Sequence, residues 1–293
     1  MKIQTLSVVV PRPEGSKKCI NNCPFCVSRM RKTEYVPTNF YTHIEIKRRL
    51  QFARDNGCNT MIITGEGEAI QNKEFLNKLW QRNKEITNPF LWIELQTTGV
   101  MLDEATIEYF QYNGVSTISL SVADIFSDHN NNSIIGTPPK GQINLEELCK
   151  KIKDAGLNLR LSINMIRVYN NYSPERIMKR AKELGADQVI FREFYVENNG
   201  CEEDKWIREH KAYNRTIDDI ANYILKEGRS LERLPFGAMR YSINGISVVL
   251  DTNCMAGTGG PTDQTGEEVI RYLILRPNNK LYTKWNDKGS LIF

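Results

Sequence analysis

The sequence predicts an α/β fold, a partial or full parallel barrel of six β/α units with a carboxyl-terminal extension. Apolar runs rich in Val and Ile recur along the chain, and charged segments with apolar residues three and four apart separate them. This alternation is typical of βαβ units, which form parallel sheets. Several helical segments are followed directly by glycine, which ends a helix at low cost. A parallel barrel gathers its active site at the carboxyl ends of its strands.

Six strands and five helices are expected before residue 200. The strands are predicted at residues 5–10, 60–64, 91–97, 117–122, 158–163 and 187–191. The crossover helices are predicted at residues 41–56, 73–86, 104–113, 145–155 and 174–184. Each helix separates two expected strands, as the parallel arrangement requires.

The pattern changes after Asn198-Asn199-Gly200. One helix is predicted at residues 206–228, followed by strands at 246–250 and 270–275 and a hairpin through 277–280 into 281–285. We therefore expect two regions: a barrel core at residues 1–199, and an extension at residues 200–293 that packs on the core and covers the barrel opening. The glycine-rich segment 257–262 lacks the Lys-Ser/Thr ending of a phosphate-binding loop and is weak evidence for one.

Composition and charge exclude several classes of protein. Apolar residues make up 40% and charged residues 25%, which is typical of a soluble globular protein. Lys and Arg exceed Asp and Glu by 39 to 35, so a nucleic-acid partner is not expected. No run approaches the roughly 18 apolar residues of a membrane span, and the amino terminus lacks a signal-peptide cleavage site. We expect a cytoplasmic protein without membrane association.

Three of the seven cysteines lie within eight residues, directly after the first expected strand. Cys19, Cys23 and Cys26 are too crowded for a secreted disulfide framework, and three soft thiolates suit zinc or an iron–sulfur cluster. A structural zinc site would need a fourth Cys or His, and none lies between Arg29 and Thr42. On a [4Fe–4S] cluster, three ligands leave one iron open for another molecule. Cys58 and Cys149 fall on predicted helices or their edges and are interpreted as packing residues.

The CxxxCxxC spacing, with Phe25 before the last cysteine, resembles the signature of the radical S-adenosylmethionine (SAM) superfamily. The resemblance implies a partial parallel (β/α)6 barrel, with a [4Fe–4S] cluster on Cys19, Cys23 and Cys26 and SAM on the open iron. The reduced cluster of this family cleaves SAM to methionine and a 5′-deoxyadenosyl radical, which takes hydrogen from a substrate. A reductant protein such as flavodoxin or ferredoxin is also implied, and the enzyme would be an oxidoreductase or lyase.

Later strand ends match the family at its SAM-binding positions. The turn at residues 64–68 is similar to the Gly-Gly-Glu-Pro segment, with Ala69 in place of Pro, and it is open whether Glu66 or Glu68 faces the SAM amine. The fourth strand is similar to the family's Ser-Xaa-Asp strand, with Val122 in place of Asp or Asp shifted to Asp124. By this resemblance the cofactor-binding residues are Phe25, Gly65, Glu66, Gly67, Glu68, Thr97, Thr98, Ser119, Ser121, Ser162, Asn164 and Phe191.

Substrate residues are expected at the ends of the fifth and sixth strands, namely Arg160, Arg192 and Glu193. Cys254 is a candidate hydrogen-atom donor or a packed thiol. The basic residues, and a faint similarity of residues 190–200 and 271–285 to the GTP cyclase family of molybdenum-cofactor biosynthesis, favour a nucleotide or other anionic small molecule. That family's second cluster is not expected, because only Cys201 and Cys254 follow residue 200. The alternatives are a peptide-modifying radical SAM enzyme and a non-catalytic zinc or iron–sulfur binding protein.

Overall fold

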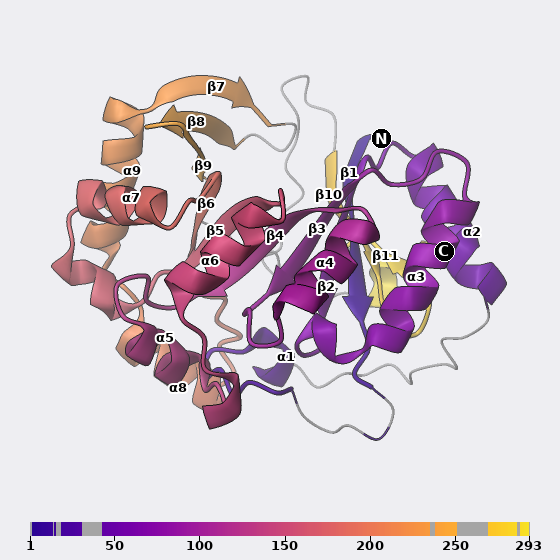
Figure 1. Cartoon of the computed structure of the whole chain (residues 1–293), viewed down its shortest axis with the longest axis horizontal. Helices are drawn as coiled ribbons and strands as arrows, with labels where there is room; N and C mark the ends of the chain where they lie inside the picture. Colours follow the sequence, from indigo (N-terminus) through magenta and orange to yellow (C-terminus); the bar gives the residue numbers. More distant parts are fainter. Residues whose placement is uncertain are drawn as a thin grey trace.

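The computed structural model describes residues 2–13, 15, 19–30, 43–234, 238–250, 269–285 and 288–292. Within this part of the chain the strands form one sheet, in the order β11-β10-β1-β2-β3-β4-β5-β6-β9-β8-β7. The six central strands follow the chain order and pair in parallel, with a helix between each two. Figure 1 shows the sheet crossing the molecule with helices packed against it. The predicted α/β fold with a partial parallel barrel is confirmed.

The six core strands all lie where the sequence predicts them, with ends shifted by at most three residues. They are β1 Lys2–Val10, β2 Thr60–Gly65, β3 Trp92–Thr97, β4 Val115–Val122, β5 Asn158–Asn164 and β6 Gln188–Arg192. The five predicted helices are α2 His43–Asp55, α3 Lys73–Glu85, α4 Glu104–Tyr112, α6 Leu145–Asp154 and α7 Pro174–Glu183. Two further helices, α1 Val27–Met30 and α5 Asp128–Ile135, are not predicted.

The single helix predicted at residues 206–228 is wrong, because the structure has two helices there. They are α8 Glu202–His210 and α9 Asn214–Glu227. Lys211 between them is extended and forms a bridge to Ile166, and Ala212 donates its N–H to the carbonyl of Met165 at 2.9 Å. Backbone pairing with the segment after β5 therefore interrupts the helix.

The remaining strands extend both edges of the core sheet. They are β7 Arg229–Arg233, β8 Met239–Ile243, β9 Ile246–Leu250, β10 Val269–Leu275 and β11 Leu281–Tyr282. β9 pairs in parallel with β6, and β10 pairs in parallel with β1 at the opposite edge (Figure 1). The predicted hairpin into residue 281 is present as β10–β11, while β7 and β8 are not predicted.

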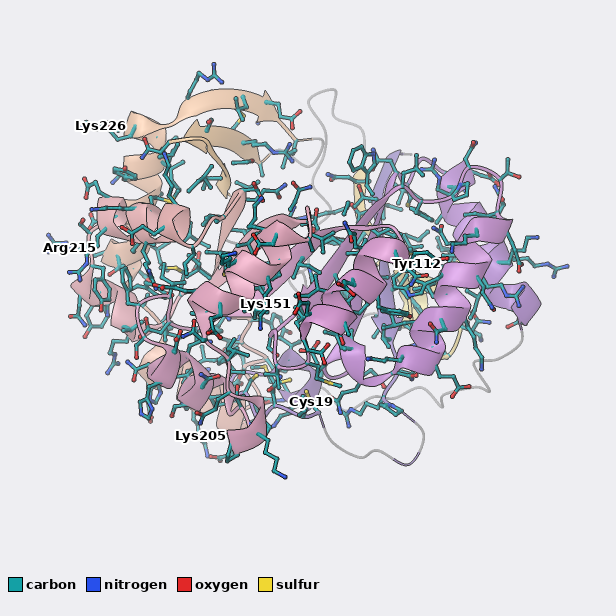
Figure 2. The ribbon with its side chains drawn as sticks, viewed as in Figure 1. Cys19, Tyr112, Lys151, Lys205, Arg215 and Lys226 are labelled. Atoms are coloured by element: carbon teal, nitrogen blue, oxygen red, sulfur yellow. The ribbon has the colours of Figure 1, made fainter. Side chains whose placement is uncertain are left out.

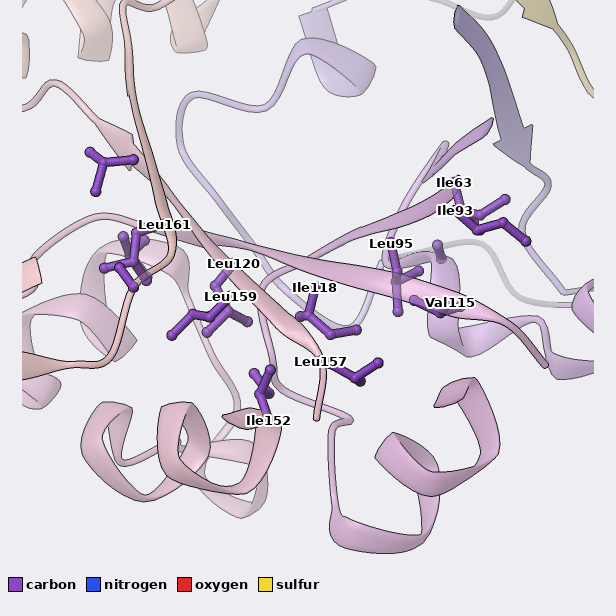
Figure 3. Close-up of a cluster of buried hydrophobic side chains, with 14 of the residues drawn as sticks. Ile63, Ile93, Leu95, Val115, Ile118, Leu120, Ile152, Leu157, Leu159 and Leu161 are labelled. Carbon is purple, nitrogen blue, oxygen red and sulfur yellow. The ribbon is translucent and has the colours of Figure 1, made fainter. Parts of the chain in front are cut away.

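The two faces of the central sheet differ in chemistry. One face is apolar and packs against the helices: Leu120 of β4 and Leu159 of β5 are fully buried near Ile152 of α6 (Figure 3). The other face is polar, with Glu94, Ser119 and Ser162 all buried. Because strand residues alternate between faces, the polar side chains gather on the side away from these helices. None of the described helices is long and apolar enough to cross a membrane.

Candidate active site

The three clustered cysteines lie on the loop between β1 and α1. Cys19, Cys23 and Cys26 are half-buried free thiols. Burial raises the pKa of Cys19, and it raises the pKa of Cys23 to about 12 with a further contribution from the nearby Cys26 and Cys19. The Cys19 and Cys23 thiols are therefore partly shielded from water. A bound metal has the opposite effect on the pKa of a thiol, since the charge of the metal favours the deprotonated thiolate that coordinates it.

Hydrogen bonds tie this cysteine loop (residues 19–26) to three separate elements. The Ile20 N–H donates to Gln71 Oε1 at 2.9 Å, in the short 3-10 helix Ala69–Gln71 after β2. Asn21 Nδ2 donates to Thr98 Oγ1 at 2.8 Å, at the end of β3. The Asn22 N–H donates to the Gly136 carbonyl at 3.2 Å, at the end of α5. The loop is thus held on the carboxyl ends of the strands.

The glycine-rich turn after β2 lies directly against Cys19. The Glu68 N–H donates to Cys19 Sγ at 3.2 Å. A Cβ on Gly67 would lie 3.2 Å from Cys19 Cβ, and one on Gly65 would lie 2.8 Å from the Gly67 carbonyl oxygen. Gly67 allows the close approach to Cys19, and Gly65 allows the turn to fold back on itself. The backbone of Glu66 is bonded to β1 instead, because its N–H donates to the Val10 carbonyl at 3.1 Å.

Glu68 presents a buried, half-satisfied carboxylate. Its Oε2 accepts hydrogen bonds from the Thr98 N–H at 3.0 Å and the Thr98 hydroxyl at 2.8 Å. Its Oε1 is buried and finds no donor among the described residues, and the same is true of Asn21 Oδ1. Burial raises the pKa of Glu68. The two orphaned acceptors leave room for a ligand that donates hydrogen bonds, and a cationic amine would restore the charge balance.

The turn after β3 is shaped by Thr97 and Gly99. The buried Thr97 hydroxyl accepts a hydrogen bond from the Gly99 N–H at 3.0 Å. Gly99 has φ +89°, and a Cβ there would lie 2.5 Å from Leu148 Cδ2. Thr97 therefore shapes the turn, whereas Thr98 makes the contacts to the cysteine loop and to Glu68.

Several predicted residues meet on the polar sheet face. Ser119 is 1% exposed and is paired in register with Arg160, and Ser121 is paired with Ser162. Arg192 Nε of β6 donates to Ser162 Oγ at 3.3 Å. At the end of β5, Asn164 Nδ2 donates to the Val122 carbonyl at 3.2 Å. The structure thus brings Ser121, Ser162, Asn164 and Arg192 together at the carboxyl ends of β4–β6.

Arg160 lies on the same face but deeper. Its guanidinium forms an ion pair with Glu94 of β3, which is 4% exposed, and its Nε donates to Gln188 Oε1 at 2.8 Å. Arg160 is the third residue of β5, whereas Asn164 is the last. The structure therefore places Arg160 in an internal ion pair near the amino ends of the strands.

Four other predicted residues lie in different surroundings. Phe191 is buried in the helix-facing core, and Glu193 is exposed just beyond β6. Phe25 packs against two aromatic rings described below. Asp124 accepts hydrogen bonds from the Phe126 N–H and Asn130, which holds the turn before α5. Cys254 lies outside the described residues.

Cys149 on α6 and Cys58 before β2 differ in their surroundings from the three cysteines of the loop. Cys58 and Cys149 are buried in the core, and burial raises the pKa of each to about 12. Neither is near a strand's carboxyl end, since Cys58 precedes β2 and Cys149 lies on α6. The interpretation of both as packing residues agrees with their positions.

The donor set fits an iron–sulfur cluster with a partly open coordination. Among the described residues, no three Cys, His, Asp or Glu side chains converge on a single-ion site. In a four-iron cluster each thiolate binds a different iron, so three ligands need not converge on one point. The free thiols of the cysteine loop and the two orphaned acceptors on Glu68 and Asn21 lie together, which suits a cluster beside a ligand with an amine.

Figure 2 shows Cys19 on the same side of the molecule as Lys205 of α8.

The family of the chain follows from a sequence match. Residues 14–184, more than half of the chain, match the model of the radical SAM superfamily. The chain belongs to this superfamily and is a radical SAM enzyme, so its cofactors are a [4Fe–4S] cluster and SAM. The predicted resemblance is confirmed.

Individual relatives share part of the chain or its fold. A PqqA peptide cyclase of Granulibacter bethesdensis is 30% identical over 176 residues, which cover 60% of this chain and 44% of that enzyme. The chain therefore spans less than half the length of this relative. Streptococcus suis SuiB bound to S-adenosylmethionine has a TM-score of 0.58 at 16% identity, over 96% of this chain and 60% of that one.

A further solved structure, native anSMEcpe with bound AdoMet and Kp18Cys peptide, has a TM-score of 0.62 at 12% identity. The match covers 99% of this chain and 76% of that one. Identities this low show the fold alone. None of these three relatives is the GTP cyclase of molybdenum-cofactor biosynthesis.

Sequence reasoning missed the residues that hold the site in place. They are Asn21, Asn22, Gln71 and Gly136, with Phe194 and Trp206 against Phe25. The only sequence signal for Asn21 and Asn22 is that they lie between the first two cysteines. Gln71 and Gly136 carry no local signal, because their role depends on contacts with residues far away in the chain.

Proposed function

We propose that this chain modifies a peptide with a radical made from SAM, and that Cys19, Cys23 and Cys26 hold the cluster. The observation that carries the peptide substrate is the 30% identity to a PqqA peptide cyclase over 60% of the chain. The match includes more than the cluster motif, since 176 residues extend far beyond the cysteine loop. The nucleotide expected from the sequence gains no support from the relatives named above.

The surroundings of Arg160 and Arg192 also favour a peptide substrate over a nucleotide. The expectation of an anionic substrate depends on basic residues at strand ends, yet Arg160 neutralises the buried Glu94. Arg192 donates to the hydroxyl of Ser162, and no second described arginine accompanies it at the ends of β5 and β6. Binding a nucleoside triphosphate requires several cationic or backbone N–H donors. Hydroxyl, amide and single guanidinium groups instead suit the neutral polar backbone of a peptide.

The cofactors, when bound, supply a 5′-deoxyadenosyl radical. The chain's own residues would bind and orient SAM: Glu68 Oε1 and Asn21 Oδ1 offer acceptors for the N–H groups of its amine. Glu68 is preferred over Glu66 for this role, because Glu68 contacts Cys19 through its N–H while the Glu66 backbone is bonded to β1. Ser121, Ser162 and Asn164 provide hydroxyl and amide groups for the rest of SAM or the substrate. A reductant such as flavodoxin or ferredoxin stays a prediction.

The cluster assignment is tested with the reconstituted enzyme. Under anaerobic conditions, dithionite and SAM should yield 5′-deoxyadenosine from the wild type. Cys23→Ala should lose both the cluster absorbance and this product, because two thiolates cannot hold the cluster. Cys149→Ala is the matched control and should keep both, since Cys149 lies in the core. A Cys23→Ala variant with a full cluster would contradict the assignment.

The substrate is tested by deuterium transfer into 5′-deoxyadenosine. The enzyme is supplied with a mixture of perdeuterated peptides from a proteolytic digest or, separately, with deuterated nucleoside triphosphates. Mass spectrometry should find deuterium in 5′-deoxyadenosine with the peptides only. Transfer from the nucleotides, or from neither pool, would count against a peptide substrate.

A further inference from the structure

Helix α1, directly after the third cysteine, is tied to helix α8 far along the chain. Arg29 Nε of α1 forms an ion pair with Glu203 Oε1 of α8 at 2.9 Å. The Glu203 side chain is only 9% exposed, while that of Arg29 is 44% exposed. A buried carboxylate without its cationic partner is strongly unfavourable, so Glu203 holds Arg29 in a fixed place.

The same guanidinium reaches the cysteine loop. Arg29 Nη1 donates to Asn22 Oδ1 at 2.6 Å and to the Cys23 carbonyl at 3.4 Å. Arginine presents its N–H groups in a rigid planar fork, so an anchor at Nε sets the direction of Nη1. Glu203 thereby determines where Arg29 donates between the first two clustered cysteines.

An aromatic contact joins the loop to α8 a second time. The Phe25 ring lies 4.9 Å from Phe194 and 5.5 Å from Trp206, measured between ring centroids. Trp206 is itself stacked on His210 of the same helix, with centroids 4.3 Å apart. Figure 1 shows α1 and α8 on the same side of the sheet, below it in this view. The loop is thus held from α8 by one charged and one apolar contact.

Helix α8 is itself firmly anchored. Asp204, beside Glu203, is completely buried and accepts three backbone hydrogen bonds. The donors are the N–H groups of Glu197 at 2.9 Å, Asn199 at 3.0 Å and Gly200 at 3.3 Å. These residues belong to the segment that follows β6. The helix can therefore act as a rigid support for the cysteine loop.

We propose that Glu203 is a positioning residue for the cluster, and that through Arg29 it keeps the cysteine loop in the shape that binds iron. The inference rests on the assignment of Cys19, Cys23 and Cys26 as ligands and is independent of the substrate. Without the charge of Glu203, Arg29 is released and the loop becomes more mobile. The cluster is then lost more readily, and its reduction potential changes because hydrogen bonding and solvent exposure near the sulfurs change.

The test compares Glu203→Gln with Glu209→Gln, which removes the same charge from an exposed position on the same helix. Both variants are reconstituted anaerobically, and cluster loss to an iron chelator is followed by absorbance. Glu203→Gln should lose its cluster about tenfold faster than wild type, as expected for one lost charged hydrogen bond. Its reduced cluster should give an altered EPR spectrum with SAM, while Glu209→Gln matches the wild type. Equal behaviour of the two variants would overturn the proposal.

Arg29→Lys provides a second, independent variant. Lysine keeps the positive charge for Glu203 but lacks the planar fork that reaches Asn22 and the Cys23 carbonyl. We expect the same fast cluster loss, and no further loss when Glu203→Gln is added, because both changes break one connection. A normal cluster lifetime in Arg29→Lys would refute the proposal, and this variant decides the matter if Glu203→Gln fails to fold.

Two controls distinguish a failure of this proposal from a failure of the ligand assignment on which it rests. Thermal unfolding of the cluster-free variants should match the wild type within a few degrees, which excludes a general loss of stability. A full cluster in Cys23→Ala would remove the ligand assignment itself. A normal wild-type cluster with no difference between Glu203→Gln and Glu209→Gln would instead remove only the role of Glu203.

Discussion

At the residue scale, Arg160 and Arg192 share a sheet face and have different surroundings. Period-two alternation places both on the polar face, and the sequence predicts both as substrate ligands. The structure pairs Arg160 with the buried Glu94, while Arg192 donates to a neutral hydroxyl at the carboxyl end of β6. Alternation indicates which face of the sheet a side chain lies on, but not how far along the strand it lies or what it contacts. It therefore does not distinguish an internal ion pair from a ligand-binding group.

We predict that Arg160→Leu destabilises the cluster-free protein by about 2–3 kcal/mol, because Glu94 is left as an unpaired buried charge. Chemical denaturation under anaerobic conditions measures this change. The double variant Glu94→Gln/Arg160→Leu should regain most of the lost free energy of unfolding, since no buried charge remains. Arg192→Leu should cost less than about 1 kcal/mol, as it loses one hydrogen bond. Equal losses in Arg160→Leu and the double variant would contradict the ion-pair explanation.

The candidate site was predictable from sequence only in its local parts. CxxxCxxC identifies three sulfur donors because all of them lie on one loop, and the 64–68 turn is recognisable by its glycines. The residues that anchor the loop cannot be predicted from the local sequence, because they lie far away in the chain. The Ile20 N–H donates a hydrogen bond to Gln71, and Asn21 donates one to Thr98. Nothing in the local pattern indicates that an amide or hydroxyl so far along the chain is a partner.

At the scale of single elements, helix caps explain why most boundaries were predictable. Helix α4 begins after Asp103, whose carboxylate accepts the Thr106 N–H at 2.8 Å. Helix α5 is different, because it contains three consecutive asparagines, which are poor helix formers. Asn132 bonds the Ile143 backbone, and Asn131 accepts from the Ala123 N–H. Tertiary contacts thus stabilise α5, which is why its sequence does not predict it.

We predict that Asp103→Ala lowers the free energy of unfolding by about 1 kcal/mol at pH 7, the usual cost of losing an N-cap. Hydrogen bonds from the Thr106 side chain and backbone lower the pKa of Asp103. A carboxylate with a lowered pKa stabilises the folded state above its unfolded pKa of about 3.9, and this contribution is lost as the pH falls through the folded pKa. Denaturation curves should show a constant difference from pH 7 to about pH 5 that narrows only in more acidic solution. A difference that grows on acidification would contradict this account.

At the scale of the whole molecule, the two ends of the sheet come from the carboxyl-terminal region. β10 pairs along β1 from Lys2 with Val269 to Val8 with Leu275, and β9 pairs with β6. The division at residue 199 therefore crosses two strand pairings within one sheet. The extension as a cover for the barrel opening stays a prediction.

We predict that a fragment of residues 1–199 does not fold on its own, because β1 and β6 would both become open edges with buried apolar residues exposed. Calorimetry should show no cooperative transition for this fragment. The matched control is the full chain cut at a protease site inserted after the exposed Gly200, whose two pieces should stay together and melt cooperatively. A soluble 1–199 fragment with its own sharp transition would contradict the prediction.

The pairing of β1 with β10 also orders events during synthesis. Lys2 and its partner Val269 are far apart in the chain, so Val269 is made long after Lys2. At roughly 5–20 residues per second, β1 waits on the order of tens of seconds for β10. During that time its fully buried residues Leu6 and Val8 line an unpaired edge. The first strand therefore keeps one edge open to contacts with other chains until β10 has been made and pairs with it.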